Sequence, residues 1–272
     1  MKTNILLLTG IFLITVIACK EKPKTDVATV KIKGEEVTYA TDSTTMNGYI
    51  AYDENKETKR PGVLVIHEWW GHNDYTRKRA EMLAELGYVA IAIDMYGDGK
   101  QANHPQDAAK FAASVMGNLP EATARFNAAL EVLKNNPNVD TDKIAAIGYC
   151  LGGSIALTMA NNGADLDAVA AFHSGVQLPV MPTDRLKANV FVGNGAEDPF
   201  IAPETVADFK RAMDSVQADY EYVAYEGAVH AYTNKEADSL GKKFNLPLAY
   251  QREADEKAWK SLKKLLETSF NN

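Results

Sequence analysis

The sequence predicts an α/β protein with a mostly parallel central sheet and helices on both faces. Short apolar runs, such as those at 63–67 and 169–172, alternate along the chain with longer segments of helical periodicity. Strands that are apolar on both faces are typical of parallel sheets covered by helices. The chain has 272 residues, of which 46% are hydrophobic and 24% are charged. This composition is enough for one sizeable core without a second domain.

The strands are expected to begin with an opening pair and to continue as buried runs. They lie at 30–37, 46–52, 63–67, 88–94, a run that begins after Asp142, 169–172, 190–193 and 222–225. Helices are expected at 75–86, around 122–133, directly after Gly153, at 204–216 and at 251–269.

The helix assignments depend on end signals and on apolar faces. The helix at 75–86 stops before Gly87, a residue suited to the position after a helix end. The later helices place two apolar sets each on one face, namely Ala122, Phe126, Ala129, Leu130 and Leu133, then Trp259, Leu262 and Leu266. The segment 96–120 has weaker periodicity, and we expect it to form part of a cap over the site.

A glycine-rich turn around Cys150 is the strongest functional signal. The segment Gly148-Tyr149-Cys150-Leu151-Gly152-Gly153 directly follows an apolar run and directly precedes a helix-like segment. A nucleophile on a sharp strand-to-helix turn needs neighbours without Cβ atoms, so that the side chain can project from closely packed backbone. The structural alternative is a turn that holds a small buried cysteine. The pattern favours acyl-transfer chemistry with Cys150 as nucleophile.

Two further residues follow strands in the order that such chemistry requires. Asp198 comes after the run at 190–193, and His230 comes after the run at 222–225. Nucleophile, acid and histidine, in that order, are typical of the α/β-hydrolase fold. His230 would exchange the thiol proton, and Asp198 would orient its imidazole. The alternative for Asp198 is a cap on the helix that starts near Ala202.

The chain resembles the dienelactone hydrolase family, the cysteine branch of the α/β-hydrolases, over roughly residues 30 to 270. The Gly-Tyr-Cys-Leu-Gly-Gly turn is the most specific match, and the segment 63–71, with Glu68-Trp69-Trp70-Gly71, is the second. The resemblance implies that Glu68 pairs with the Cys150 thiol and helps to ionise it. It also implies that the backbone N–H groups of Trp69 and Leu151 form the oxyanion hole.

Glu68 can also be interpreted without the family. It lies between an apolar strand and two tryptophans, and this position favours partial removal from water. A desolvated carboxyl has a raised pKa, which suits proton exchange with a thiol. An exposed loop glutamate is the alternative, and the sequence alone does not separate the two.

The substrate prediction departs from the family. Dienelactone hydrolases hold a substrate carboxylate with arginines, but no arginine occurs in 231–234 after the histidine or in 97–99 after the strand at 88–94. A neutral ester or lactone is therefore expected in place of dienelactone. Five aromatic residues are expected to line its pocket, with core packing as the alternative: Trp69, Trp70, Tyr75, Tyr96 and Tyr232.

Charge and histidine spacing limit the partners. The formal net charge is −7 and the isoelectric point is near 5.3, which argues against nucleic acid as a partner. The remaining histidines, His67, His72, His104 and His173, show no metal-ligand spacing. We expect no metal, no cofactor and a monomer that acts on a small molecule.

The N-terminus predicts a lipid-anchored protein of the bacterial cell envelope, facing the periplasm or the surface. Residues 1–18 have a basic start and an apolar run too short for a comfortable membrane span. Val16-Ile17-Ala18-Cys19 resembles a lipobox, in which Cys19 is lipidated; an ordinary signal peptide or an uncleaved anchor is the alternative. Residues 19–26 are expected to be a tether, and 27–272 the catalytic domain.

Together these observations predict a membrane-tethered hydrolase that cleaves a small ester or lactone through a thioester at Cys150. The alternative from another class is a non-catalytic envelope protein that uses the same pocket to bind a ligand. A thiol-dependent peptidase or acyltransferase would share the first half-reaction and differ only in the bond cleaved or in the acceptor.

Overall fold

The computed structural model describes residues 29–271. The predicted signal peptide, Cys19 and the whole of the predicted tether at 19–26 lie outside the described residues. Within 29–271, no helix combines the length and the apolar character needed to cross a membrane.

One sheet organises the described part of the chain, where eight strands lie in the order β1-β2-β4-β3-β5-β6-β7-β8. The strands are β1 (Ile32–Ala40), β2 (Thr45–Asp53), β3 (Arg60–Ile66), β4 (Val89–Ile93), β5 (Val139–Tyr149), β6 (Ala168–Phe172), β7 (Asn189–Gly195) and β8 (Tyr220–Tyr225). The helices are α1 (Asp74–Glu85), α2 (Pro105–Met116), α3 (Leu119–Lys134), α4 (Leu151–Asn161), α5 (Pro203–Ser215), α6 (Ala237–Phe244) and α7 (Arg252–Phe270).

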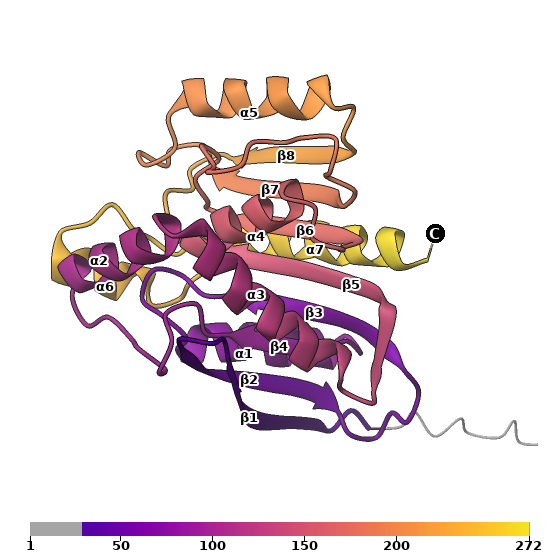
Figure 1. The fold of residues 1–272 in the computed structure, drawn as a ribbon. Coiled ribbons are helices and arrows are strands. Elements are labelled where there is room, and N and C mark those ends of the chain that lie inside the picture. Colours follow the sequence, from indigo (N-terminus) through magenta and orange to yellow (C-terminus); the bar gives the residue numbers. More distant parts are fainter. Residues whose placement is uncertain (1–28, 272) are drawn as a thin grey trace, which may run out of the picture.

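The sheet is parallel from β4 through β3 to β8, and the opening strands β1 and β2 are antiparallel. Helices α3, α4 and α5 pack on one face, whereas α1 and α7 pack on the other (Figure 1). The buried runs of β3, β4 and β6 are apolar on both faces because helices cover both. The predicted α/β-hydrolase fold is confirmed.

Two helices were not expected from the sequence, and strand β5 begins earlier than predicted. Helix α2 lies inside the weakly periodic segment, where His104 caps it and Pro105 starts it. Helix α6 has eight residues and buries only Ala237 and Gly241, so its apolar pattern is too short to recognise. Strand β5 starts at Val139 because its first residues pair with β3 ahead of a register shift.

Helices α2 and α6 lie beside one another, outside the carboxyl ends of the strands (Figure 1). Phe244 of α6 stacks on Trp70 and also contacts His104, the cap residue of α2. These contacts form a small apolar cluster separate from the main core. The two helices thus cover the edge of the sheet at which the predicted site residues emerge.

Candidate active site

Cys150 occupies the sharp turn between β5 and α4. Its φ is +53°, a left-handed conformation that costs a residue with a Cβ about 1–3 kcal/mol. Two glycines allow the turn to pack closely. A Cβ at Gly148 would lie 2.1 Å from the backbone of Gly152, and a Cβ at Gly152 would lie 2.3 Å from the carbonyl oxygen of Ile66. The geometry is that of a nucleophile elbow with its thiol at the start of α4.

Asp198 and His230 meet at the ends of β7 and β8. The Nδ1–H of His230 donates to Oδ2 of Asp198 at 2.7 Å, and Oδ1 of Asp198 accepts the N–H of Phe200 at 2.9 Å. Ala202 is the N-cap of α5, so the helix-cap alternative for Asp198 is wrong. Cys150 and His230 line the same cavity. The structure therefore brings the three predicted residues together.

The environment of His230 favours its protonated form. Burial alone would lower the pKa of this imidazole. Interactions with Cys150 and Asp198 outweigh that effect and raise the pKa of His230 to about 10. The site thus places an imidazole that favours its protonated form beside the Cys150 side chain.

Glu68 is buried, so the exposed-loop alternative is wrong. It is 3% exposed, and burial raises the pKa of its carboxyl to about 7 despite the opposing effects of Asn234, His230 and Arg79. Oε2 of Glu68 accepts a hydrogen bond from Nδ2 of Asn234 at 2.7 Å. The carboxyl is thus paired with this amide, and its pairing with the Cys150 thiol stays a prediction.

We expect Glu68→Gln to stabilise the protein at high pH. The raised pKa means that the native state resists ionisation of Glu68 between about pH 4.5 and 7, whereas the unfolded chain ionises freely. The wild-type protein therefore loses stability across this window, by up to about 3 kcal/mol. Glutamine keeps the shape without the charge. Denaturant unfolding at pH 5 and pH 8 measures the effect, and an equal stability difference at the two pH values would contradict it.

The two predicted oxyanion amides lie close to the nucleophile. Leu151 is the first residue of α4, so its N–H has no acceptor within the helix. Among residues 29–271, no acceptor is hydrogen-bonded to the N–H of Trp69. The close approach of Gly152 to the end of β3 brings the two segments together. Both N–H groups are therefore available for a ligand, although their role stays a prediction.

An apolar cavity of about 300 Å³ opens at Cys150. Its lining comes from several loops and from α2 and α4, and consists of Trp69, Ala112, Cys150, Leu151, Ser154, Gly175, Phe200, Ile201, His230 and Leu248. The ring of Phe200 packs edge-on against His230 with 5.1 Å between centroids, and Phe200 itself is 54% exposed. None of the lining residues is a lysine, an arginine or a carboxylate. The cavity suits an uncharged group.

Of the five aromatic residues predicted to line the pocket, only Trp69 does so. The other four do not line this cavity. Trp70 and Tyr75 line a separate cavity of about 370 Å³ beside α6. The hydroxyl of Tyr96 donates to the carbonyl oxygen of Trp69, and that of Tyr232 donates to Gly193 within the core.

Sequence reasoning missed several residues that complete the site. Asn234, which pairs with Glu68, was noted only as a position without arginine. Phe200 follows the acid by two residues, which is a usable signal for a pocket residue. Ala112 and Leu248 come from segments without chemical patterning, so no signal identifies them. Within the described residues, no three His, Cys, Asp or Glu side chains are grouped as a metal site.

Comparison with known proteins places this geometry in a family. Residues 46–270 match the dienelactone hydrolase family. Protein usf of Aquifex pyrophilus is 28% identical over 76% of this chain and 90% of its own length. A protein of Aquifex aeolicus, provisionally named a carboxymethylenebutenolidase, is 27% identical with the same coverage.

Solved structures show the same relationship. The structure named m3DLH has a TM-score of 0.83 and 34% identity, over 88% of this chain and 99% of that one. A dienelactone hydrolase-like promiscuous phosphotriesterase from metagenomic libraries has a TM-score of 0.81 and 33% identity, with the same coverage.

Proposed function

Because the chain belongs to the dienelactone hydrolase family and is a hydrolase acting on ester or lactone bonds, we propose that it cleaves these bonds through a covalent thioester at Cys150. The observation that carries the proposal is the placement of Cys150 and His230 on the wall of one apolar cavity, with His230 hydrogen-bonded to Asp198. This arrangement provides a nucleophile, a proton carrier and a group that orients the carrier.

The reaction proceeds in two halves. The Cys150 thiolate attacks the carbonyl carbon, and the oxyanion accepts hydrogen bonds from the N–H groups of Trp69 and Leu151. The carbon–oxygen bond to the leaving group then breaks, and His230 gives that oxygen its proton. In the second half, His230 takes a proton from water while the hydroxide attacks the thioester. The carboxylic acid departs, and the thiolate is restored.

The thioester is tested by mass spectrometry. A slow ester mixed with the purified protein should leave its acyl group on the peptide that contains Cys150, and the adduct should decay at the turnover rate. Added alcohols or amines that capture the acyl group faster than water would favour the acyltransferase alternative. Turnover with an acyl group on another side chain would contradict the proposal. The family assignment disfavours the non-catalytic alternative.

We propose that the substrate is uncharged near the scissile bond, because the cavity is mostly apolar and no lysine or arginine lines it. The expected result is that 4-nitrophenyl butyrate is cleaved with a kcat/KM about 100-fold above that of the equally long 4-nitrophenyl hydrogen succinate, since the second ester must desolvate a charge. Ala112→Lys introduces a cation at the wall and should reduce this ratio at least about tenfold. Ala113→Lys, on an exposed position of α2, is the matched control. An unchanged ratio in Ala112→Lys would argue against this substrate class.

We also propose that the protein is anchored to a bacterial membrane through a lipid on Cys19. The lipobox-like segment 16–19 supports this proposal. Metabolic labelling with palmitate should tag the wild-type protein and leave Cys19→Ala unlabelled. Because Cys150 is the other cysteine of the chain, Cys150→Ala serves as the control and should keep the label. Equal labelling of Cys19→Ala and wild type would contradict the lipid anchor.

A further inference from the structure

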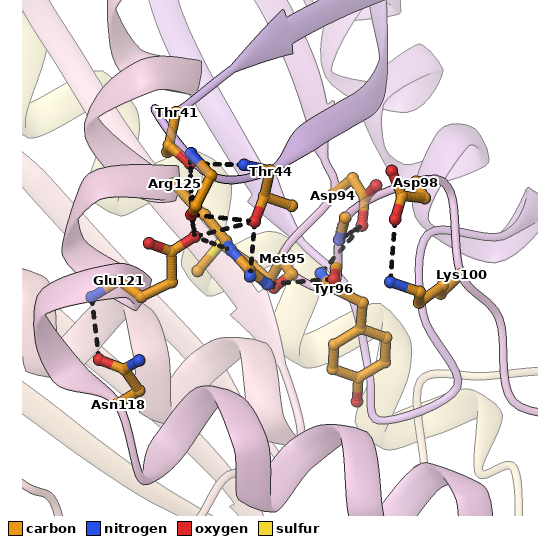
Figure 2. A network of polar contacts seen from close by, with 12 residues as sticks. Thr41, Thr44, Asp94, Met95, Tyr96, Asp98, Lys100, Asn118, Glu121 and Arg125 are labelled. Atoms are coloured by element: carbon orange, nitrogen blue, oxygen red, sulfur yellow. Dashed lines mark hydrogen bonds and ion pairs between the residues drawn. The ribbon is translucent and has the colours of Figure 1, made fainter.

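The turn that follows β4 is held rigidly by one carboxylate. Oδ1 of Asp94 accepts the N–H groups of Tyr96 and Gly97, each at 2.9 Å. Its Oδ2 accepts the N–H of Gly99 at 2.9 Å and that of Asn47 at 3.2 Å. Asp94 itself is fully buried. These four hydrogen bonds fix the backbone of the turn that carries Tyr96, and Figure 2 shows Asp94 beside Tyr96.

Arg125 of α3 fixes the same turn from its other side. Its Nη1 donates to the carbonyl oxygens of Met95 and Tyr96 at 2.8 and 3.1 Å. The guanidinium is held in place by Glu121 at 2.8 Å and by the hydroxyl of Thr44 at 3.2 Å (Figure 2). A charged guanidinium that donates several hydrogen bonds, as that of Arg125 does, is costly to displace. The position of the Tyr96 side chain is therefore set by α3 as well as by β4.

The Tyr96 side chain connects this turn to the loop after β3. Its hydroxyl donates to the carbonyl oxygen of Trp69 at 2.9 Å, and its ring packs edge-on against His67 with 4.7 Å between centroids. His67 connects the same two loops, because its Nε2 accepts the N–H of Met95 and its Nδ1 donates to the carbonyl oxygen of Glu68. Burial raises the pKa of Tyr96 far above its usual range, so the hydroxyl remains a donor.

We propose that Tyr96 is a positioning residue that aims the N–H of Trp69 at the oxyanion. The N–H and the carbonyl of Trp69 flank the same Cα, so a hydrogen bond on the carbonyl restricts rotation of the backbone on which the N–H direction depends. This inference rests on the proposed function, in which that N–H stabilises the oxyanion. An oxyanion donor that is present but poorly aimed loses much of its effect, because this kind of stabilisation requires fixed geometry.

Tyr96→Phe tests the inference, since it removes the hydroxyl and keeps the ring packing. The rate at which 4-nitrophenyl butyrate acylates Cys150 should fall about 10- to 100-fold with little change in KM. Iodoacetamide alkylates a thiolate at a saturated carbon and forms no oxyanion, so its reaction with Cys150 should remain within about twofold of wild type. Tyr49→Phe removes a comparable hydroxyl, which donates to Glu81 at 3.0 Å, and should change neither rate.

The outcomes separate this inference from the proposed function. If acylation is equally fast in Tyr96→Phe and wild type, the inference is wrong while the thioester mechanism stands. If acylation and alkylation fall together, the hydroxyl maintains the site as a whole, and the specific role of Tyr96 is also wrong. If the wild-type protein never acylates Cys150, the proposed function is wrong, and this inference is wrong as well.

A second, independent network holds the other half of the site. The hydroxyl of Thr233 lies 2.6 Å from that of Tyr75 and 2.7 Å from Nε2 of His173. The carbonyl oxygen of Thr233 accepts a hydrogen bond from Arg79 at 2.6 Å. The His173 ring in turn packs against His230 with 5.3 Å between centroids. Thr233, three residues after His230, thus connects α1 with the segment that follows β6.

Arg79 holds this network in a fixed position. Its side chain is 5% exposed and pairs with Asp255 of α7 at 2.7 Å. Its guanidinium lies 5.2–5.5 Å from the ring centres of Tyr75, Tyr149 and Trp259. A desolvated guanidinium surrounded by aromatic faces and a carboxylate is held strongly. The loop that carries His230 is therefore anchored to α1 and α7.

We infer that the Thr233 hydroxyl positions His230 against Cys150. Thr233→Val keeps the shape and the carbonyl contact to Arg79 but removes the hydroxyl. Alkylation of Cys150 by iodoacetamide at pH 7 should slow about tenfold, and kcat should fall with little change in KM, because a displaced imidazolium stabilises the thiolate less. This is the opposite signature to Tyr96→Phe, which should leave alkylation intact.

Thr233→Ser is the rescue variant, because it restores the hydroxyl on a smaller side chain and should recover most of the alkylation rate. Thr205→Val removes an exposed hydroxyl on α5 and should behave as wild type. The inference is overturned if Thr233→Val alkylates as fast as wild type. It is equally overturned if Thr233→Ser is as slow as Thr233→Val.

Discussion

Replacing Cys150 with alanine is expected to lower ester hydrolysis by at least about 10⁴-fold, because no thioester can form and the remaining groups only bind and polarise the substrate. Cys150→Ser should retain little activity. A hydroxyl is far harder to deprotonate than a thiol, so a site suited to a thiol supplies too weak a base to activate it. Initial rates with 4-nitrophenyl butyrate measure both effects.

The strain at Cys150 provides a control for folding. Its left-handed backbone suits glycine, so Cys150→Gly should be inactive yet no less stable than wild type in thermal unfolding. Full esterase activity in Cys150→Ala would end the thioester proposal and direct attention to Ser154, which lines the same cavity. Ser174 is a weaker substitute because it is fully buried and its hydroxyl donates to Phe172.

The parts of the site that could be predicted are those fixed by strand order. Cys150, Asp198 and His230 each follow an apolar run, and the carboxyl ends of parallel strands meet at one edge of the sheet. Their convergence therefore follows from sequence alone once the runs are recognised. The glycines at 148 and 152 add the steric condition for the elbow. The contacts among the three side chains add atomic detail to that expectation.

The parts that could not be predicted depend on contacts between distant loops. Glu68 pairs with Asn234, 166 residues further along the chain, and no local pattern links them. Tyr96 follows a strand as a pocket residue would, but rotation within its turn points the hydroxyl at Trp69. Side-chain direction in a loop is set by which backbone groups need partners. The sequence alone does not show which backbone groups in the folded protein need a side-chain partner.

His230→Ala is expected to lower activity nearly as far as Cys150→Ala, by about 10³- to 10⁴-fold, since both proton transfers pass through the imidazole. Asp198→Asn should lower the hydrolytic activity less than His230→Ala does. Its Oδ1 can still accept the N–H of Phe200, so the change disturbs mainly the orientation and charge of the imidazole. His230 lines the cavity, and added imidazole should therefore restore part of the activity of His230→Ala without affecting Cys150→Ala.

The pH dependence of alkylation shows whether His230 acts on the thiol as proposed. The raised pKa of His230 keeps the imidazole protonated through neutral pH, and its charge favours the Cys150 thiolate there. Wild-type Cys150 should thus react rapidly with iodoacetamide at pH 6 to 7. In His230→Ala the reaction should be slow at pH 6 and should rise with pH around ~8.5, as for an ordinary thiol. Identical profiles for the two proteins would show that the thiolate does not depend on His230, and Glu68 would then be the remaining buried group able to take the thiol proton.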